Sequence, residues 1–245
     1  MASQTDKTIG VLGGLGPEAT LDFCSRVLKN TPASSDQDHF RCIVDNNAKA
    51  PNRNDAIAGH GPSPEPSFAN SAKMLENSGA DFIVMPCNTA HAFDSAIIDA
   101  VSIPFVSIID ETCWYIEREF TQVEKVGLLA VDGCLQTQLY QPKLVALGMQ
   151  VFTLPDEDQE KFMQTIYRIK SQGIEVQSQQ QMHAYASQLI EAGAQILIAA
   201  CTEIPMVLSN DDIPVPLVES TEILAQQTVN YANGSRELVQ GLTTC

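Results

Sequence analysis

Residues 78–90 read SGADFIVMPCNTA, and residues 192–204 read AGAQILIAACTEI. Both stretches contain a Gly-Ala pair, an apolar run and a cysteine, so that Cys87 is matched by Cys201, 114 positions later. A short, continuously apolar run bounded by a glycine is typical of a buried strand. The repeat therefore predicts two related halves, each with one thiol directly after a buried strand.

A second repeat lies upstream of the first. The stretches IGVLGGLGPEAT (9–20) and VGLLAVDGCLQT (126–137) share three residues at an offset of 117 positions. These are Gly10, Gly16 and Thr20 in the first half, and Gly127, Gly133 and Thr137 in the second. Paired halves place a cleft between them, and one thiol from each wall suits chemistry on both faces of a single carbon.

Apolar runs alternate with amphipathic stretches along the whole chain, which is typical of α/β proteins with parallel sheets. We expect strands at 8–14, 41–47, 81–86, 103–108, 125–130, 150–154, 195–200 and 213–219. We expect helices at about 17–28, 67–78, 111–120, 137–147, 157–171 and 178–192, and a last one that ends near 233. The fold class predicted is α/β, with two pseudo-symmetric domains, each a mainly parallel sheet flanked by helices, and an active site in the interdomain cleft. The first domain is expected to comprise residues 1–105 plus 214–245, and the second residues 106–213.

Composition excludes several classes of protein. The chain has 245 residues, of which 44% are apolar, and no apolar run approaches the ~20 residues that a spanning helix needs. Its formal net charge of −16 disfavours nucleic acid and acidic membrane surfaces as partners. The start lacks a secretory pattern, so we expect a cytoplasmic protein. The seven cysteines show no metal-ligand spacing, which disfavours a zinc site.

The residues after each repeated cysteine favour a reactive thiol. Asn88 and Thr89 follow Cys87, and Thr202 follows Cys201; these residue types cap helices well, so each sulfur is expected near a helix N-terminus. Backbone N–H groups there lower the pKa of a thiol from ~8.5 and favour the thiolate. Two alternatives remain, buried core thiols and a disulfide between the pair, but matched positions favour a functional pair over both.

Two further residues lie close to the thiols in sequence. His91 follows Cys87 by four positions, on a similar helix face, and is either a proton-exchange partner or a packed core histidine. Glu203 follows Cys201 by two positions and either assists that thiol or is an acidic residue of a helix's first turn.

The turn that begins at Gly14 fits the GxGxxA pattern of a dinucleotide-binding loop, but this pattern is weak without an acidic residue at the end of a second strand. We expect instead that amides of this turn meet a small carboxylate. Arg53 and Lys170 are the cations nearest the expected cleft in the two halves. Taken alone, either is more simply a solvated surface charge.

The motifs GGLGPEAT, DNNAKAPNR, PCNTAH, IYRIK and CTEIP, in this order and spacing, resemble those of the aspartate/glutamate racemase family, which works without pyridoxal phosphate. The resemblance spans about residues 9–224. It implies two α/β domains facing each other, commonly in a homodimer, with an acidic amino acid in the cleft and no cofactor. It identifies Cys87 and Cys201 as the two acid/base thiols. Substrate contacts are implied for Arg53, Asn88, Thr89, Lys170 and Thr202, with Arg53 and Lys170 as carboxylate partners.

The expected reaction is therefore racemisation of aspartate, with one cysteine on each face of the α-carbon. Three positions depart from the usual family pattern: Asn52 stands before Arg53, Ala200 before Cys201, and Cys134 after Gly133. These departures leave the specificity for the side chain open. The alternatives are a glutamate or other amino-acid racemase, a maleate cis–trans isomerase, and a two-lobed binding protein without catalysis.

Overall fold

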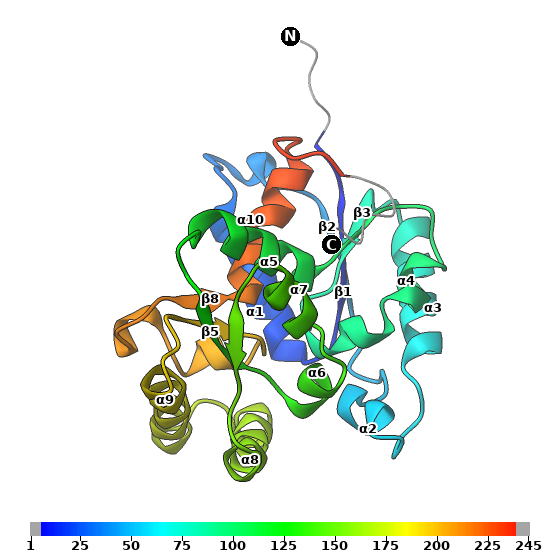
Figure 1. Cartoon of the computed structure of the whole chain (residues 1–245). Coiled ribbons are helices and arrows are strands. Elements are labelled where there is room, and N and C mark those ends of the chain that lie inside the picture. The colour runs from blue at the N-terminus through cyan, green and yellow to red at the C-terminus, as the bar shows by residue number, and fades with distance from the viewer. Residues whose placement is uncertain (1–5, 239–245) are drawn as a thin grey trace. The chain divides into compact units, whose positions relative to one another are not determined.

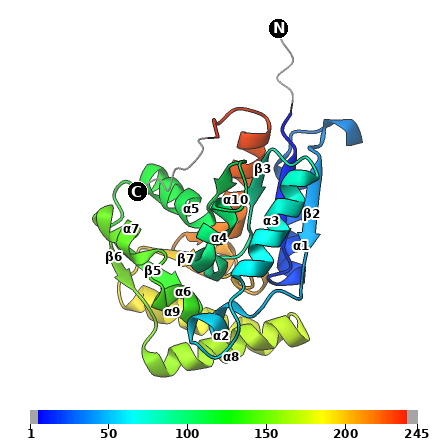
Figure 2. The same cartoon turned by 90° about the vertical axis from the view of Figure 1, so that its right-hand side faces the viewer.

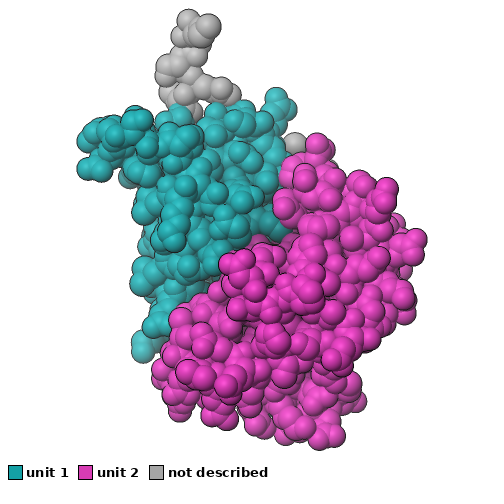
Figure 3. Space-filling model, turned by 90° about the vertical axis from the view of Figure 1, so that its left-hand side faces the viewer, with its two compact units in different colours: residues 1–111, 221–245 teal, residues 112–220 magenta. Residues whose placement is uncertain are grey.

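A computed structural model describes residues 6–238 of the chain (Figure 1). The chain divides into two compact units, one of residues up to 111 together with residues from 221 onward, the other of residues 112–220 (Figure 3). Both changes of unit come a few residues later in the chain than the expected domain boundaries. The expected first domain also includes residues 1–5 and 239–245, which lie outside the described residues, as does Cys245.

The first unit is built on a parallel four-stranded sheet. Its strands are β1 (Ile9–Gly13), β2 (Cys42–Asn46), β3 (Phe82–Val84) and β4 (Phe105–Val106). Their order is β2-β1-β3-β4, so β1 and β3 are central and β2 and β4 are edges. Every residue of β1 is buried, as its continuously apolar sequence predicts.

Helices cover this sheet. The unit contains α1 (Pro17–Asn30), α2 (Arg53–Ile57), α3 (Glu65–Asn77), α4 (Ser95–Ile98), and the 3₁₀ turns η1 (Asp36–Asp38) and η2 (Thr89–Phe93). Helices α5 (Ile108–Glu119) and α10 (Ser220–Ala232) run across the changes of unit. Phe68 and Leu75 of α3 pack with Leu12 and Ile83 of the sheet in one buried cluster, which fixes α3 against the two central strands (Figure 2).

The second unit repeats the sheet with the same order of strands. Its strands are β5 (Lys125–Leu129), β6 (Gln150–Phe152), β7 (Ile196–Ala199) and β8 (Leu217–Glu219), in the order β6-β5-β7-β8, all parallel. Two parallel four-stranded sheets flanked by helices confirm the predicted α/β class. Strand β8 pairs with β7, so residues 217–219 belong to the second sheet, although the sequence analysis placed residues 214–245 in the first domain.

The helices of the second unit differ from expectation most clearly at residues 137–147. They are α6 (Asp132–Gln136), α7 (Gln141–Ala146), α8 (Asp156–Gln172), α9 (Val176–Glu191), and the 3₁₀ turns η3 (Ile204–Met206) and η4 (Asn210–Asp212). The single helix predicted at about 137–147 is wrong, because α6 ends at Gln136 and α7 begins only at Gln141. Gln138 has φ 52, a left-handed conformation that ends a helix, and Pro142 lies in the first turn of α7, where proline is tolerated.

The repeated Gly-Ala pair has a structural explanation in the first unit. Gly79 takes φ 91 directly after α3, and the Ala80 N–H donates to the Leu75 oxygen at 3.1 Å, which ends the helix as a left-handed glycine cap does. Ala80 then lies against β1 at Gly10, where an added Cβ would be 2.9 Å from the Ala80 Cβ. The pair thus ends the helix and packs the start of β3 closely on the central strand.

The second unit uses the same device. Gly193 takes φ 105 after α9, and the Ala194 N–H donates to the Leu189 oxygen at 3.1 Å. An added Cβ at Gly127 of β5 would lie 3.1 Å from the Ala194 Cβ. The residues shared between the halves are therefore those that set the spacing between strand and helix end.

Candidate active site

The first thiol lies directly after β3. Cys87 is buried and free, three residues beyond the end of the strand, and η2 begins two residues later. Asn88, at the N-cap position of η2, makes no side-chain cap hydrogen bond, so the capping role predicted for it is wrong. Asn88 and Thr89 are both buried beside the thiol, which places their polar groups at the carboxyl end of the sheet.

His91 is held by the backbone on both sides of its ring. Its Nδ1 lies 2.8 Å from the Cys87 carbonyl oxygen and must donate to it, while Nε2 accepts the Ile108 N–H at 3.2 Å. Burial lowers the pKa of the buried His91 ring, which favours the neutral form that this pair of bonds requires. Of the two roles considered for His91, this geometry fits a positioning role: the ring holds the Cys87 peptide against the residue that begins α5.

The Gly14 turn is more closed than the sequence analysis expected. Gly14 has φ 86, and an added Cβ would lie 2.2 Å from the Asn47 carbonyl carbon, so only glycine fits. Its N–H donates to Thr20 Oγ1 at 2.9 Å, and that hydroxyl donates to the Gly16 oxygen at 3.0 Å. The Gly14 amide expected to meet a carboxylate is therefore used inside the turn.

Arg53 links the Gly14 turn to α2. As the first residue of that helix, it donates from Nη1 to the Pro51 oxygen and from Nη2 to the Leu15 oxygen, each at 3.0 Å. Because a guanidinium has five N–H donors, these bonds orient it and leave donor capacity for an anion. Arg53 is half-buried, at the carboxyl end of the first sheet.

The second thiol belongs to a compact charged cluster. Cys201 is buried two residues after β7, and its Sγ donates to Glu203 Oε2 at 2.9 Å. Lys170 of α8 places its Nζ 3.0 Å from Glu203 Oε1, and the Thr202 hydroxyl donates to Oε2 at 3.3 Å. The Glu203 carboxylate thus accepts hydrogen bonds from the Cys201 thiol and the Thr202 hydroxyl and pairs with the Lys170 ammonium.

This cluster reverses the expected ionisation of the second thiol. Burial raises the pKa of Cys201 well above its ordinary value, and the Glu203 carboxylate raises it further, while the Lys170 ammonium lowers it in part. The prediction that a helix N-terminus lowers the pKa of this thiol is wrong here. Only the short turn η3 follows, and Glu203, not Thr202, occupies its N-cap position.

Each unit therefore brings together its own share of the predicted residues at the carboxyl end of its sheet. The first unit holds Cys87, His91, Arg53, Gly14, Asn88 and Thr89, and the second holds Cys201, Thr202, Glu203 and Lys170. The pairing of Lys170 with Glu203 was not expected, since a 3.0 Å contact between residues 33 positions apart has no local signal in the sequence.

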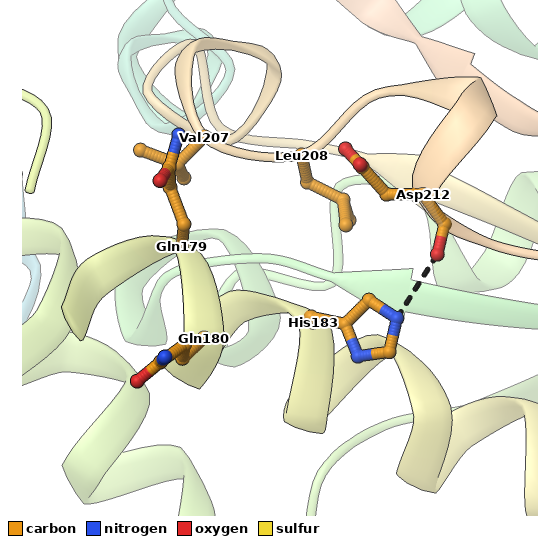
Figure 4. Close-up of a pocket in the computed structure, with 6 residues that line it drawn as sticks. All are labelled: Gln179, Gln180, His183, Val207, Leu208 and Asp212. Carbon is orange, nitrogen blue, oxygen red and sulfur yellow. Dashed lines mark hydrogen bonds between the residues drawn. The ribbon is translucent and has the colours of Figure 1, made fainter. Parts of the chain in front are cut away.

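The second unit also contains a cavity of about 380 Å³ between α9 and the segment that follows η3 (Figure 4). It is lined by Gln179, Gln180, His183, Val207, Leu208 and Asp212. The His183 Nε2 donates to the Asp212 carbonyl oxygen at 2.9 Å. None of the predicted site residues lines it.

Residues 6–238 lack two features that mark other classes of site or segment. No helix in this range combines the length and the apolar character that crossing a membrane requires. Nor does any group of three or more His, Cys, Asp or Glu side chains in this range have the placement to hold a metal ion.

Comparison with known proteins gives consistent results. Residues 12–228 match the model of the family described as Asp/Glu/Hydantoin racemase. The chain is 31% identical over 231 residues to the broad specificity amino-acid racemase RacX of Bacillus subtilis, a match that covers 91% of this chain and 96% of the relative.

Among solved structures, the Picrophilus torridus aspartate racemase superposes with a TM-score of 0.83 and 28% identity, covering 95% of this chain and 96% of that one. The glutamate racemase isoform RacE1 of Bacillus anthracis, at 21% identity and a TM-score of 0.64 over 97% of this chain and 85% of its own, shares the fold. The family match over most of the chain and the near full-length relative confirm the resemblance seen in the sequence. The chain belongs to the Asp/Glu/hydantoin racemase family.

Proposed function

We propose that this protein interconverts L- and D-aspartate without a cofactor, with Cys87 and Cys201 acting on opposite faces of the α-carbon. One observation carries the proposal: in a chain of a racemase family, each unit holds one buried, free thiol directly after the equivalent strand of its sheet. The proposal requires both thiols to reach one substrate, as in the interdomain cleft that the sequence analysis expects.

The ionisation of Cys201 assigns starting roles to the two thiols. Its S–H is donated to Glu203 and its pKa is raised, so in the resting protein Cys201 is the proton donor. In this direction the proposal requires Cys87 to be the base that removes the α-proton, while Cys201 delivers its own proton to the opposite face. The protons balance: Cys87 ends as thiol and Cys201 as thiolate, which is the starting state for the reverse reaction.

An α-proton beside a carboxylate is a very weak acid, so the site must stabilise the negative charge that develops on that carboxylate. Asn88 and Thr89 are buried close to the thiols and supply amide or hydroxyl donors for this purpose, whereas the Thr202 hydroxyl, which donates to Glu203, must exchange that partner to contribute. Donors fixed before the reaction stabilise the transition state without reorganisation, and losing one such donor typically costs ~10²–10³ in kcat.

Arg53 and Lys170 are proposed to bind the two carboxylates of aspartate. Arg53 is already oriented by two carbonyl oxygens, whereas Lys170 is paired with Glu203. A substrate carboxylate therefore competes with Glu203 for the ammonium. Because about a third of the Lys170 side chain is exposed, it can meet a substrate without unpacking the core.

Aspartate is proposed as the substrate because the Picrophilus torridus aspartate racemase matches in structure over nearly the whole chain. The Bacillus subtilis relative supports a second candidate, racemisation of several amino acids, since it is described as having broad specificity. Initial rates with both enantiomers of aspartate, glutamate and neutral amino acids, scored by chiral chromatography, distinguish the two.

The decisive test is L-aspartate in deuterated water with no added cofactor. We expect D-aspartate to appear with deuterium at the α-carbon, while the remaining L-aspartate stays protiated early in the reaction, because two different bases remove and deliver the proton. Early exchange in recovered L-aspartate would indicate a single base. Absence of both racemisation and exchange with every amino acid of the panel would refute racemase activity.

A further inference from the structure

A buried carboxylate lies in the first turn of α5, outside the residues proposed for catalysis. Glu111 is 5% exposed. Its Oε1 accepts the Tyr231 hydroxyl at 2.7 Å, and its Oε2 pairs with the Arg236 guanidinium. These partners come 120 and 125 positions later in the chain, at the end of α10 and just beyond it. We call Glu111, Tyr231 and Arg236 the Glu111 cluster.

Both partners are needed to keep this carboxylate in place. Burial raises the pKa of Glu111, whereas the Tyr231 hydroxyl and the Arg236 guanidinium lower it. A buried charge that loses a partner is costly, so Glu111 stays bound to its two donors. Arg236 is itself oriented by a second bond, from Nη1 to Gln227 Oε1 at 2.9 Å. The first turn of α5 is therefore fixed to α10 and to the segment that follows it.

The same turn of α5 holds His91. Ser107 precedes the helix, and its carbonyl oxygen accepts the Glu111 N–H at 3.0 Å while its Oγ accepts the Asp110 N–H at 3.3 Å. The Ile108 N–H has no acceptor within the helix, because it belongs to the first turn, and it donates to His91 Nε2 at 3.2 Å. The Glu111 carboxylate and the His91 ring are thus bound to one helical turn.

His91 connects this turn to Cys87, because its Nδ1 donates to the Cys87 carbonyl oxygen at 2.8 Å. Tyr231 makes a second connection to the same part of the chain. Its ring centroid lies 6.3 Å from that of Phe82, the residue that begins β3, and Cys87 follows three residues beyond this strand. Tyr231 thus contacts the strand before Cys87 and the helix whose first turn holds His91.

We propose that the Glu111 cluster positions Cys87 through His91. By fixing the first turn of α5, the cluster keeps the Ile108 N–H on the ring, and the ring keeps the Cys87 peptide in place. The three members are positioning residues, since none of them is proposed to touch the substrate. This role rests on the proposed function only in taking Cys87 as an acid/base group.

A second buried network in the same unit provides a matched control. Glu222 of α10 accepts hydrogen bonds from Arg26 Nη1 at 3.0 Å and from Asn30 Nδ2 at 2.9 Å. Like Glu111, it is a carboxylate bound by one arginine and one neutral donor. It joins α10 to α1 rather than to α5, so Glu222→Gln weakens a helix contact of the same unit without acting on the turn that holds His91.

Steady-state kinetics of Tyr231→Phe and Arg236→Gln test the proposal. We expect each variant to lower kcat about 10-fold and to change KM less than ~2-fold, because a displaced proton-transfer group weakens the transition state more than it weakens binding. Glu222→Gln should leave kcat as in the wild type. Urea denaturation gives the unfolding free energy of each variant, so that a loss of stability is measured separately.

Two further measurements need no substrate. In Tyr231→Phe and Arg236→Gln, the Ile108 amide should exchange with deuterated water at least ~10-fold faster, because the turn that carries it opens more often. Nitrogen-15 NMR should show a shifted His91 Nε2 resonance, because this atom loses its donor. Both signals should stay at their wild-type values in Glu222→Gln.

In an active protein, an unchanged kcat in both variants would overturn the proposal. So would losses of kcat that Glu222→Gln matches, because these would follow from stability alone. If the wild type racemised no amino acid, the proposed function would fail, and the Ile108 and His91 measurements would still decide the positioning role. Wild-type exchange and an unshifted resonance in both variants would refute it.

Discussion

The turn after β3 and the turn after β7 begin alike, yet each holds its cysteine by a different atom. After β3, the carbonyl oxygen of Cys87 is bound by a neutral histidine four residues later. After β7, the sulfur of Cys201 itself donates to a carboxylate two residues later. The first arrangement fixes the backbone and the second fixes the proton, so sequence-related halves present chemically unlike thiols.

The Gly14 turn and its counterpart differ in a similar way. Gly14 has φ 86 and lies against Asn47, whereas Val131, 117 positions later, has φ −74 at the start of α6. Yet the threonine that follows each turn makes the same bond, from Thr20 to the Gly16 oxygen at 3.0 Å and from Thr137 to the Gly133 oxygen at 2.6 Å. The repeat retains the first turn of the helix and lets the loop before it diverge.

The largest expected effect comes from removing either thiol. Cys87→Ala and Cys201→Ala should each lower racemisation at least ~10³-fold, because each removes one of two proton-transfer groups. Optical rotation of L-aspartate measures the rate. Cys113→Ala, which removes another buried thiol, is the control. Full activity in Cys87→Ala or Cys201→Ala would contradict the two-thiol mechanism.

Replacing Glu203 by Gln should lower kcat about 10²-fold and should also lower the pH at which Cys201 is half alkylated by iodoacetamide. The sign follows from the structure, since the Glu203 carboxylate raises the pKa of this thiol. Lys170→Met should move the midpoint upward, because the ammonium lowers the same pKa. Peptide mass spectrometry measures the alkylation of Cys201 separately from that of the other thiols. Glu175→Gln, which changes an exposed carboxylate, is the control.

If the pH of half alkylation of Cys201 moved in the same direction in Glu203→Gln and Lys170→Met, this interpretation would be contradicted. A general loosening of the turn would shift both variants alike, whereas loss of a negative charge and loss of a positive charge should shift the pKa of Cys201 in opposite directions.

The Gly14 turn offers a stability test with a matched pair. Gly14→Ala should destabilise the protein by about 3 kcal/mol or more, because the new Cβ meets the Asn47 backbone at 2.2 Å. Gly59→Ala adds a Cβ in open space at φ 74, so it should cost only the backbone strain, ~1 kcal/mol. Urea denaturation compares the two; equal losses would mean that the loop yields to the methyl group.

The smallest effect concerns alkaline pH. An unfolded thiol ionises near ~8.5, whereas burial keeps Cys201 protonated in the folded protein, so its stabilising contribution is present below that pH and is lost above it. The slope due to this one group is at most ~1.4 kcal/mol per pH unit. Urea denaturation at pH 7.5 and 9.5 should show a smaller loss for Cys201→Ser than for the wild type. Parallel losses would show that other groups account for the slope.

Local patterns predicted most of the fold. The apolar runs before the cysteines, the Gly-Ala pairs and the proline at the start of α1 all act within a few residues, and the strands and helices that they indicate are present. The helix expected at 137–147 was wrong because the left-handed Gln138 has a residue type that carries no such signal.

The candidate site was harder to predict because its interactions join distant parts of the chain. The positions of Cys201 and Glu203 are local, but the pKa of the thiol depends on burial and on the approach of Lys170 from α8. Similarly, His91 finds its second partner at the start of α5. The sequence identifies which residues to consider, but their protonation states and hydrogen-bond partners depend on how they pack.

Under the proposed two-thiol mechanism, the close approach of Gly10 to Ala80 makes the reaction depend on residues that never touch a substrate. A methyl group added at Gly10 would also come within 3.0 Å of the Phe82 oxygen and push β3 away from β1. Cys87 follows that strand directly, and a shift of about 1 Å in a reacting group can cost ~10²-fold in rate. The close spacing of β1 and β3 at Gly10 therefore limits how far the Cys87 sulfur can move.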